Sequence, residues 1–265
     1  NRGLTSVELY FGVPAMNLLD SLRTIRTGVS FHRKIVLSGQ ATGDLIQKND
    51  EITLDRPLHL STAAGGMYVS MLTVNAIPDS YRVAVQLTDR ETGKWGLYMQ
   101  DLVVPTYSDS LELSDLQVSS QASDSTRIEA FKKGDFWIVP APSRMFPDSS
   151  SVFIYYEIYN MDRDGMGMSD YTVSYTVREE ERKQRLFGSL VRSIPGFGKP
   201  EATETKVTLR RYSWEQNEKV FFEIEPDQLE PGLKRIGVTI KDNVTGQEVS
   251  RETALWVVGN TETKE

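Results

Sequence analysis

The chain has 265 residues, of which 39% are hydrophobic and 25% are charged, and its net charge is −7 at pH 7. This composition is typical of folded globular proteins, and the negative charge argues against nucleic-acid binding, which needs a clustered basic face. The sequence has no cysteine, which excludes disulfides, thiolate metal sites and cysteine nucleophiles. No apolar run reaches the ~18–20 residues of a membrane-spanning helix, so we expect no transmembrane segment.

The first part of the chain is predicted to form short strands. Residues 7–13 are rich in β-branched and aromatic side chains and end before Pro14, which predicts a strand. Residues 16–25 could form one short helical turn after Pro14 or an irregular crossover, and we favour the crossover because no capping pair marks a helix start. Further strands are predicted over 29–37, 51–60 and 68–74, with a polar connection over 39–50.

Residues 78–104 recur without a gap as residues 231–257, which indicates an internal repeat. Apolar residues at positions 83, 85 and 87, and again at 236, 238 and 240, alternate with polar ones, so each copy is predicted to contain a half-buried antiparallel hairpin. Asp89 and Gly93 match Asp242 and Gly246. We interpret these four residues as turn formers, because aspartate accepts hydrogen bonds from loop amides and glycine adopts positive φ.

The second half repeats this character. Strands are predicted over residues 111–119, 135–139, 152–159, 171–177, 206–209 and 219–224. Many short strands with regular turn signals predict an all-β protein of two tandem immunoglobulin- or fibronectin-III-like β-sandwiches. We place the first sandwich at residues 1–110 and the second at 111–265, with a lead-in segment over 111–150.

Residues 179–200 carry the strongest helix signal and are predicted to be a short helical insertion in the second sandwich. Apolar residues recur there at four-residue spacing among basic ones. This pattern suits docking to a partner or a membrane surface, or covering a sheet edge or the domain interface of the same chain. The candidate partner-binding residues are Leu186, Phe187, Leu190, Val191, Ile194 and Phe197.

Other candidate sites carry weaker signals. His32 and His59 have no metal ligand at a suitable spacing, and we expect neither a catalytic centre, a cofactor nor a metal site. The loop with Asp162, Asp164 and Asp170 begins like a calcium loop but lacks its later ligands, so an ordinary interstrand loop is favoured and calcium stays an open alternative. The four tryptophans could form a sugar-binding platform, although scattered core and rim positions are the preferred interpretation.

Three stretches carry a family resemblance: residues 6–14 (SVELYFGVP), 131–146 (FKKGDFWIVPAPSRMF), and 152–161 (VFIYYEIYNM) continuing to 171–177. They resemble the C-terminal region of bacterial GWxTD-domain proteins, although the Gly-Trp-x-Thr-Asp motif itself is absent. The resemblance implies a secreted or envelope protein of a bacterium and supplies no catalytic residues.

The sequence thus predicts a non-enzymatic, extracytoplasmic structural or protein-interaction module of a bacterial envelope or secreted assembly, in the periplasm or at the cell surface. The expected partner is another protein or a second copy of the chain, with peripheral contact to the envelope. The alternative is a carbohydrate-binding accessory β-sandwich.

Overall fold

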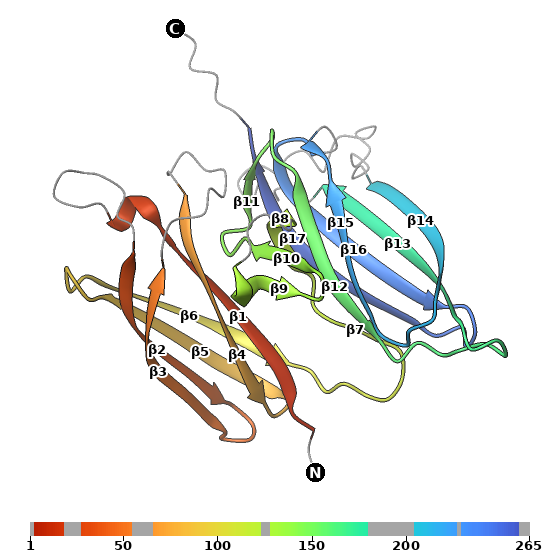
Figure 1. Cartoon of the computed structure of the whole chain (residues 1–265), viewed down its shortest axis with the longest axis horizontal. Helices are drawn as coiled ribbons and strands as arrows, with labels where there is room; N and C mark the ends of the chain where they lie inside the picture. Colours follow the sequence, from red (N-terminus) through yellow and green to blue (C-terminus); the bar gives the residue numbers. More distant parts are fainter. Residues whose placement is uncertain are drawn as a thin grey trace, which may run out of the picture. The chain divides into compact units, whose positions relative to one another are not determined.

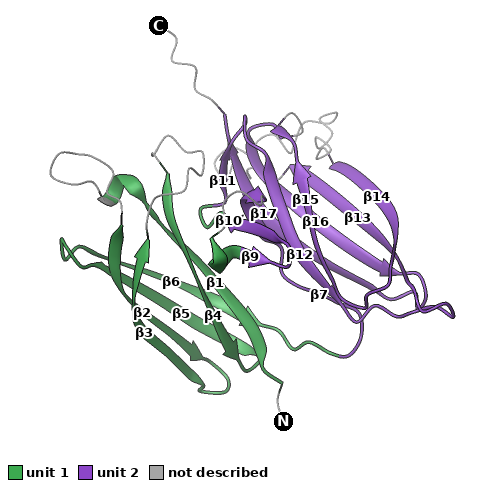
Figure 2. Cartoon of the chain, in the orientation of Figure 1, with its two compact units in different colours: residues 1–108, 128–131, 141–143 green, residues 109–127, 132–140, 144–265 purple. Residues whose placement is uncertain are grey.

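The computed structural model describes residues 3–18, 28–54, 66–122, 128–179, 204–226 and 229–259. These residues are built from β-strands and two short 3-10 turns, which confirms the all-β prediction (Figure 1). The chain divides into two compact units (Figure 2). Unit 1 comprises residues 1–108, 128–131 and 141–143, and unit 2 comprises residues 109–127, 132–140 and 144–265.

Unit 1 contains a two-stranded and a four-stranded antiparallel sheet. In the smaller sheet, β1 (Thr5–Pro14) pairs with β4 (Met67–Ala76). The 3-10 turn η1 (Ala15–Leu18) follows β1, so the described start of the expected irregular crossover is a short helical turn instead; residues 19–25 lie outside the described part. The larger sheet has the order β3-β2-β5-β6 and consists of β2 (Val29–Gly39), β3 (Leu45–Leu54), β5 (Asp79–Asp89) and β6 (Trp95–Val104). The polar connection expected over 39–50 is wrong, because β3 already begins at Leu45; residues 55–60 of the expected strand lie outside the described part.

The inner faces of these two sheets form the core of unit 1. Leu9 of β1 packs in one apolar cluster with Ile35 of β2 and with Val83 and Val85 of β5. The alternation of buried and exposed residues along β2 and β5 follows the period-two pattern of the sequence, because successive side chains of a strand point to opposite faces.

Unit 2 is larger. One of its sheets has the order β11-β17-β16-β13-β14, made of β11 (Met145–Pro147), β13 (Ser169–Glu179), β14 (Glu204–Ser213), β16 (Gly232–Asp242) and β17 (Glu248–Val258). The other contains β7 (Glu112–Leu113), β8 (Gln117–Ala122), β9 (Lys132–Lys133), β10 (Phe136–Pro140), β12 (Val152–Tyr159) and β15 (Glu218–Ile224). The second 3-10 turn, η2 (Glu129–Phe131), falls in unit 1.

The two units share one strand arrangement. The pair β1 and β4 and the order β3-β2-β5-β6 in unit 1 correspond to the pair β12 and β15 and the order β14-β13-β16-β17 in unit 2. The repeated hairpins even share their register, since Tyr81 faces Leu102 in the first and Lys234 faces Leu255 in the second. Unit 2 adds β11 beside β17, whereas no described strand lies beyond β6.

The loops of the two repeated hairpins are held by the same contacts, as expected from their sequence. In each loop the aspartate carboxylate accepts a hydrogen bond from the amide two residues later, at 3.0 Å for Asp89 and 2.7 Å for Asp242. The glycine has a positive φ in both loops, 68° at Gly93 and 78° at Gly246. The structure therefore confirms that these residues serve turn formation.

The loop between β2 and β3 uses a carboxylate from another strand. Gly39 is the last residue of β2, and a Cβ there would approach the Asp79 carboxylate to 2.7 Å. Asp79, at the start of β5, accepts hydrogen bonds from the Thr42 amide (2.8 Å) and hydroxyl (2.6 Å). These hydrogen bonds, with further ones from the Ser80 and Ala41 amides, lower the pKa of Asp79 to about 2.

Replacing Asp79 with Asn is expected to lower the free energy of unfolding at neutral pH and to have little effect near pH 2. The folded pKa of about 2 lies below the ordinary 3.8, so the stabilisation is complete well above 3.8 and is lost as the pH falls through 2. Urea unfolding across this pH range measures the difference. Gly39→Ala should displace the same carboxylate and so remove the same hydrogen bonds. If the losses of unfolding free energy from Gly39→Ala and Asp79→Asn add up fully in the double variant, the two changes act independently and this explanation is contradicted.

A buried arginine lies inside the sandwich of unit 1. Arg33 of β2 is only 5% exposed and faces inward between the cluster around Ile35 and a second one around Phe31. Its guanidinium donates two hydrogen bonds to Asp50 of β3, at 2.7 and 2.6 Å, and lies over the Phe11 ring of β1. The pair neutralises a charge in an apolar layer, and the Arg33 hydrogen bond lowers the pKa of Asp50.

Replacing Asp50 with Ala should lower the free energy of unfolding by about 3 kcal/mol, because the buried guanidinium then lacks its carboxylate. The double variant Arg33→Met with Asp50→Ala should recover most of that loss, because neither charge remains. Denaturant unfolding of the complete cycle measures both effects. A double variant as unstable as the two single losses combined would show that the residues act independently.

Candidate functional site

The six predicted partner-binding residues lie outside the described residues. They are Leu186, Phe187, Leu190, Val191, Ile194 and Phe197, all between the end of β13 and the start of β14. Glu179, the first residue of the predicted insertion, is instead the last residue of β13 and pairs with Lys234 of β16. The candidate site is therefore a different surface of unit 2, which consists of described residues.

Three connections meet at one end of unit 2: β12 to β13 (160–168), β14 to β15 (214–217), and the β16–β17 hairpin loop. The amide of Met161 donates to the carbonyl of Gln216 at 2.9 Å, which joins the first connection to the second. The amide of Asp162 donates to the Asp242 carboxylate at 2.9 Å, which joins the first connection to the hairpin loop. The backbone of this end is therefore fixed by several independent hydrogen bonds.

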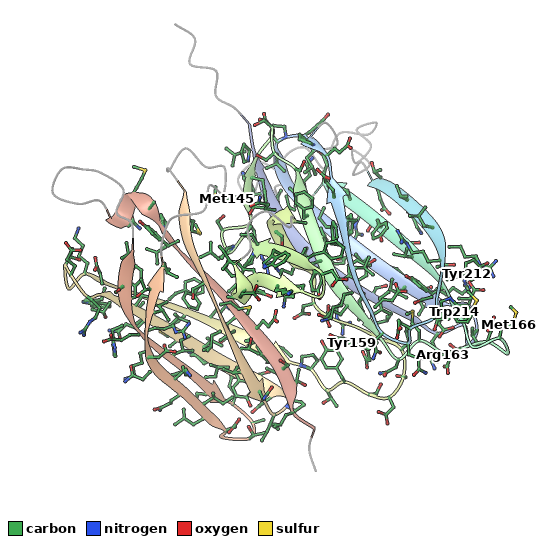
Figure 3. All side chains as sticks on the ribbon, in the orientation of Figure 1. Met145, Tyr159, Arg163, Met166, Tyr212 and Trp214 are labelled. Carbon is green, nitrogen blue, oxygen red and sulfur yellow. The ribbon has the colours of Figure 1, made fainter. Side chains whose placement is uncertain are left out.

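Large apolar side chains project from this fixed backbone. Met166 is 77% exposed, Trp214 66% and Tyr212 59%. The Arg163 guanidinium donates to the Trp214 carbonyl at 2.7 Å, so its side chain spans the first two connections. Figure 3 shows these four side chains at the same end of unit 2, and we call them the loop-end patch. Met145 and Tyr159, also labelled there, come from β11 and β12 and are not included.

A polar network beside the patch fixes Tyr212. The Arg210 guanidinium lies over the Tyr212 ring and donates to the Asp170 carboxylate of β13, with 2.9 Å between Nε and Oδ1. The Asn243 side chain donates to the same carboxylate at 2.9 Å. The hydrogen bonds from Arg210 and then Asn243 lower the pKa of Asp170 to about 2, so the network keeps its charges at neutral pH.

The acidic residues of the 160–170 segment perform separate structural roles. The Asp164 carboxylate accepts hydrogen bonds from the amides of Met166 and Met168, at 2.8 and 3.0 Å, and so closes its own turn. Asp170 binds Arg210 and Asn243, as described above. Nowhere in the described ranges do three or more acidic or histidine side chains gather in a group that could hold a metal ion.

The periodicity of the sequence along β14 contains a signal for this patch. Along β14, odd positions such as Val207 and Leu209 share the face of the inward-pointing Val173 and Tyr175 on β13. Even positions carry polar residues until Tyr212 and Trp214 continue the same phase. Two successive aromatics on a polar face indicate an exposed surface. Met166 and Arg163 offered no comparable signal, because they lie in an irregular connection.

The four tryptophans divide between exposed and half-buried positions. Trp214 is exposed in unit 2 and Trp95 in unit 1, while Trp137 and Trp256 are half-buried. The two exposed tryptophans lie in different units, so only Trp214, with Tyr212 two residues before it, belongs to a local aromatic pair.

The corresponding end of unit 1 holds an open depression lined by Gly28, Ser30, Arg90 and Glu91. The Ser30 hydroxyl forms a hydrogen bond with the Thr53 hydroxyl at 2.9 Å. This contact is with another alcohol and not with a general base that could activate Ser30 as a nucleophile. His32 is half-buried on β2, and His59 lies outside the described residues.

Within the segments that can be described, no helix has the length and apolar character needed to cross a membrane.

Comparisons with known proteins add no assignment: no protein-family model matches the chain, and no curated protein matches it either. The resemblance of three segments to GWxTD-domain proteins therefore stays a prediction.

Replacing Arg210 with Gln is expected to raise the pKa of Asp170 from about 2 towards its ordinary 3.8, because the strongest hydrogen bond to the carboxylate is lost. A pH titration of the side-chain carboxyl resonances measures the shift. The Asp79 carboxyl, in unit 1, serves as the internal control and should keep its pKa of about 2. An unchanged Asp170 titration would show that Arg210 does not hold this carboxylate in solution.

Proposed function

We propose that the chain is a non-enzymatic protein-interaction module, built from two tandem immunoglobulin-like sandwiches, that works outside the cytoplasm in a bacterial envelope or secreted assembly. The observation that carries the proposal is the loop-end patch: exposed Trp214, Tyr212, Met166 and Arg163 on a hydrogen-bonded end of unit 2. Tryptophan, tyrosine and arginine dominate the energetics of protein interfaces, and methionine is also enriched there.

The fixed geometry of the patch supports binding to a structured partner. The Asp164 turn and the Asp170–Arg210–Asn243 network hold its backbone and Tyr212 before any partner arrives. A preorganised surface loses less conformational entropy when it binds, so more of the contact energy contributes to affinity.

The extracytoplasmic and bacterial parts of the proposal rest on the resemblance of residues 6–14, 131–146 and 152–161 to GWxTD-domain proteins. The absence of cysteine is compatible with any compartment and does not affect this part.

A specific observation also favours a carbohydrate-binding role. Tyr212 and Trp214 lie two residues apart at the end of β14, and both rings are exposed. Successive aromatic rings on one strand face can stack on consecutive sugar rings, and the neighbouring Arg210 and Asp170 offer hydrogen bonds to hydroxyl groups. A protein partner is preferred because Met166 and Arg163 extend the patch beyond the two rings.

The test places a photo-crosslinking amino acid at position 166 of the full chain and compares the covalent adducts formed in the envelope fraction of the source cells. We expect one discrete protein adduct, reduced roughly 30-fold by Trp214→Ala because a central aromatic is removed. Leu45→Ala, which truncates an exposed apolar side chain in unit 1, should leave the adduct unchanged.

The same variants decide between the two roles when soluble oligosaccharides are titrated against tryptophan fluorescence. Saturable quenching that disappears in Trp214→Ala, without a protein adduct, would replace the protein-interaction role with the carbohydrate-binding one. If neither measurement depends on Trp214, the loop-end patch is not the functional surface.

A further inference from the structure

The outer edge of β6 in unit 1 is almost uncharged, and no strand of the described residues pairs with it. β6 is the last strand in the order β3-β2-β5-β6, and its residues are exposed from Trp95 to Asp101. Asp101 is the one side chain of this ten-residue strand that is charged at neutral pH, and it forms an ion pair with Arg82 of β5. Trp95, Leu97, Met99 and Val103 present large exposed apolar side chains on one face.

The other described edge strands carry features that oppose pairing. β14, β3 and β15 each contain three or more charged residues along a short sequence, and charged side chains at an edge discourage a second strand from adding. β11 has three residues and ends in Pro147. β4 is uncharged and β1 carries only Glu8, but most residues of both strands are buried or half-buried. β9 consists of two lysines. Among these edges β6 alone combines length, exposure and a near absence of charge.

The repeat shows what can occupy this position. β17 is the counterpart of β6, with the same register against its hairpin partner. In unit 2 a further strand, β11, pairs with β17 in parallel, from Met145 opposite Trp256 to Pro147 opposite Val258. In unit 2 the position beside this strand is therefore occupied by an added strand.

We propose that β6 pairs antiparallel with β6 of a second copy of this chain, with Met99 of the two copies opposite each other, so that two four-stranded sheets join into one. The loop-end patch belongs to unit 2 and this edge to unit 1, so the proposal does not depend on the function proposed above.

Backbone geometry selects this register. The Asp89 amide donates to the Lys94 carbonyl at 2.8 Å, and hydrogen-bonded pairs recur every second residue in an antiparallel ladder. The backbone groups of Gly96, Tyr98 and Gln100 therefore point to β5, and those of Leu97 and Met99 point away. Two-fold pairing centred on Met99 brings outward-pointing groups together along the whole strand, with ~10 new backbone hydrogen bonds.

Charge and side-chain chemistry support the same register. Centred on Met99, the pairing places Trp95 opposite Val103 of the second copy, and Leu97 opposite its Asp101. No two like charges meet, and each Asp101 keeps its own Arg82. A shift that centres the axis on Asp101 would place two carboxylates opposite each other, which is destabilising. A shift that centres it on Leu97 would leave the apolar end at Val103 unpaired.

Sedimentation velocity on the full chain tests the pairing. The wild type should form dimers as concentration rises, whereas Met99→Lys and Met99→Glu should each remain monomeric, because like charges then face each other across the two-fold axis. An equimolar mixture of the two variants should form a heterodimer, because the opposed charges are then complementary. Leu45→Lys, at the opposite edge of the same sheet, is the matched control and should dimerise like the wild type.

The variants are expected to fold, because Met99 is 53% exposed, and unchanged thermal unfolding at low concentration checks this. A wild type that stays monomeric at every concentration overturns the proposal. So does dimerisation of Met99→Lys, or a mixture of the two charged variants that does not associate. None of these results bears on adduct formation at position 166, so failure here and failure of the proposed function are distinguishable.

Discussion

The hydrogen bonds from loop amides to one aspartate carboxylate in each repeated hairpin set the register on which the rest of the fold depends. Asp89 and Asp242 each hold their own loop, and the strands that follow have identical pairing in the two units. Because side chains alternate with period two, a slip of one residue would turn Val83 and Val85 away from the core. The β2–β3 loop meets the same requirement differently, with the carboxylate of Asp79 supplied across the sheet beside Gly39.

This shared framework makes the differences between the copies informative. In unit 2, β11 occupies part of the edge beside β17, while the same edge of β6 in unit 1 has no described neighbour. The loop-end patch lies on connections of unit 2, where Asp164 and the Asp170–Arg210 pair hold exposed side chains in place. The interior also differs, because Arg33 and Asp50 place an ion pair within the apolar layer of unit 1. The β6 edge thus belongs to the common scaffold and differs from its counterpart in having no described neighbour, whereas the loop-end patch lies on the connections between the strands of unit 2.

The sequence predicted the hairpins and the all-β class because these depend on local periodicity and turn chemistry. The period-two pattern of residues 29–37 puts Arg33 on the same strand face as Phe31 and Ile35. Its partner Asp50 falls in the predicted polar connection, because the polar sequence of β3 lacks the alternation of a half-buried strand. The sequence contains no sign that β6 is exposed, since WGLYMQDLVV resembles a core strand. Exposure of a strand depends on which other strands lie beside it, and the periodicity of the strand itself does not record that arrangement.

Residue-resolved amide exchange along β6 tests most directly whether this edge is a pairing surface. At low concentration the amides of Gly96, Tyr98 and Gln100, which point to β5, should exchange slowly, and those of Leu97 and Met99 should exchange fast. As concentration rises, Leu97 and Met99 should become protected while exchange in β3, at the opposite edge of the sheet, stays unchanged. Fast exchange of Leu97 and Met99 at every concentration would contradict the account.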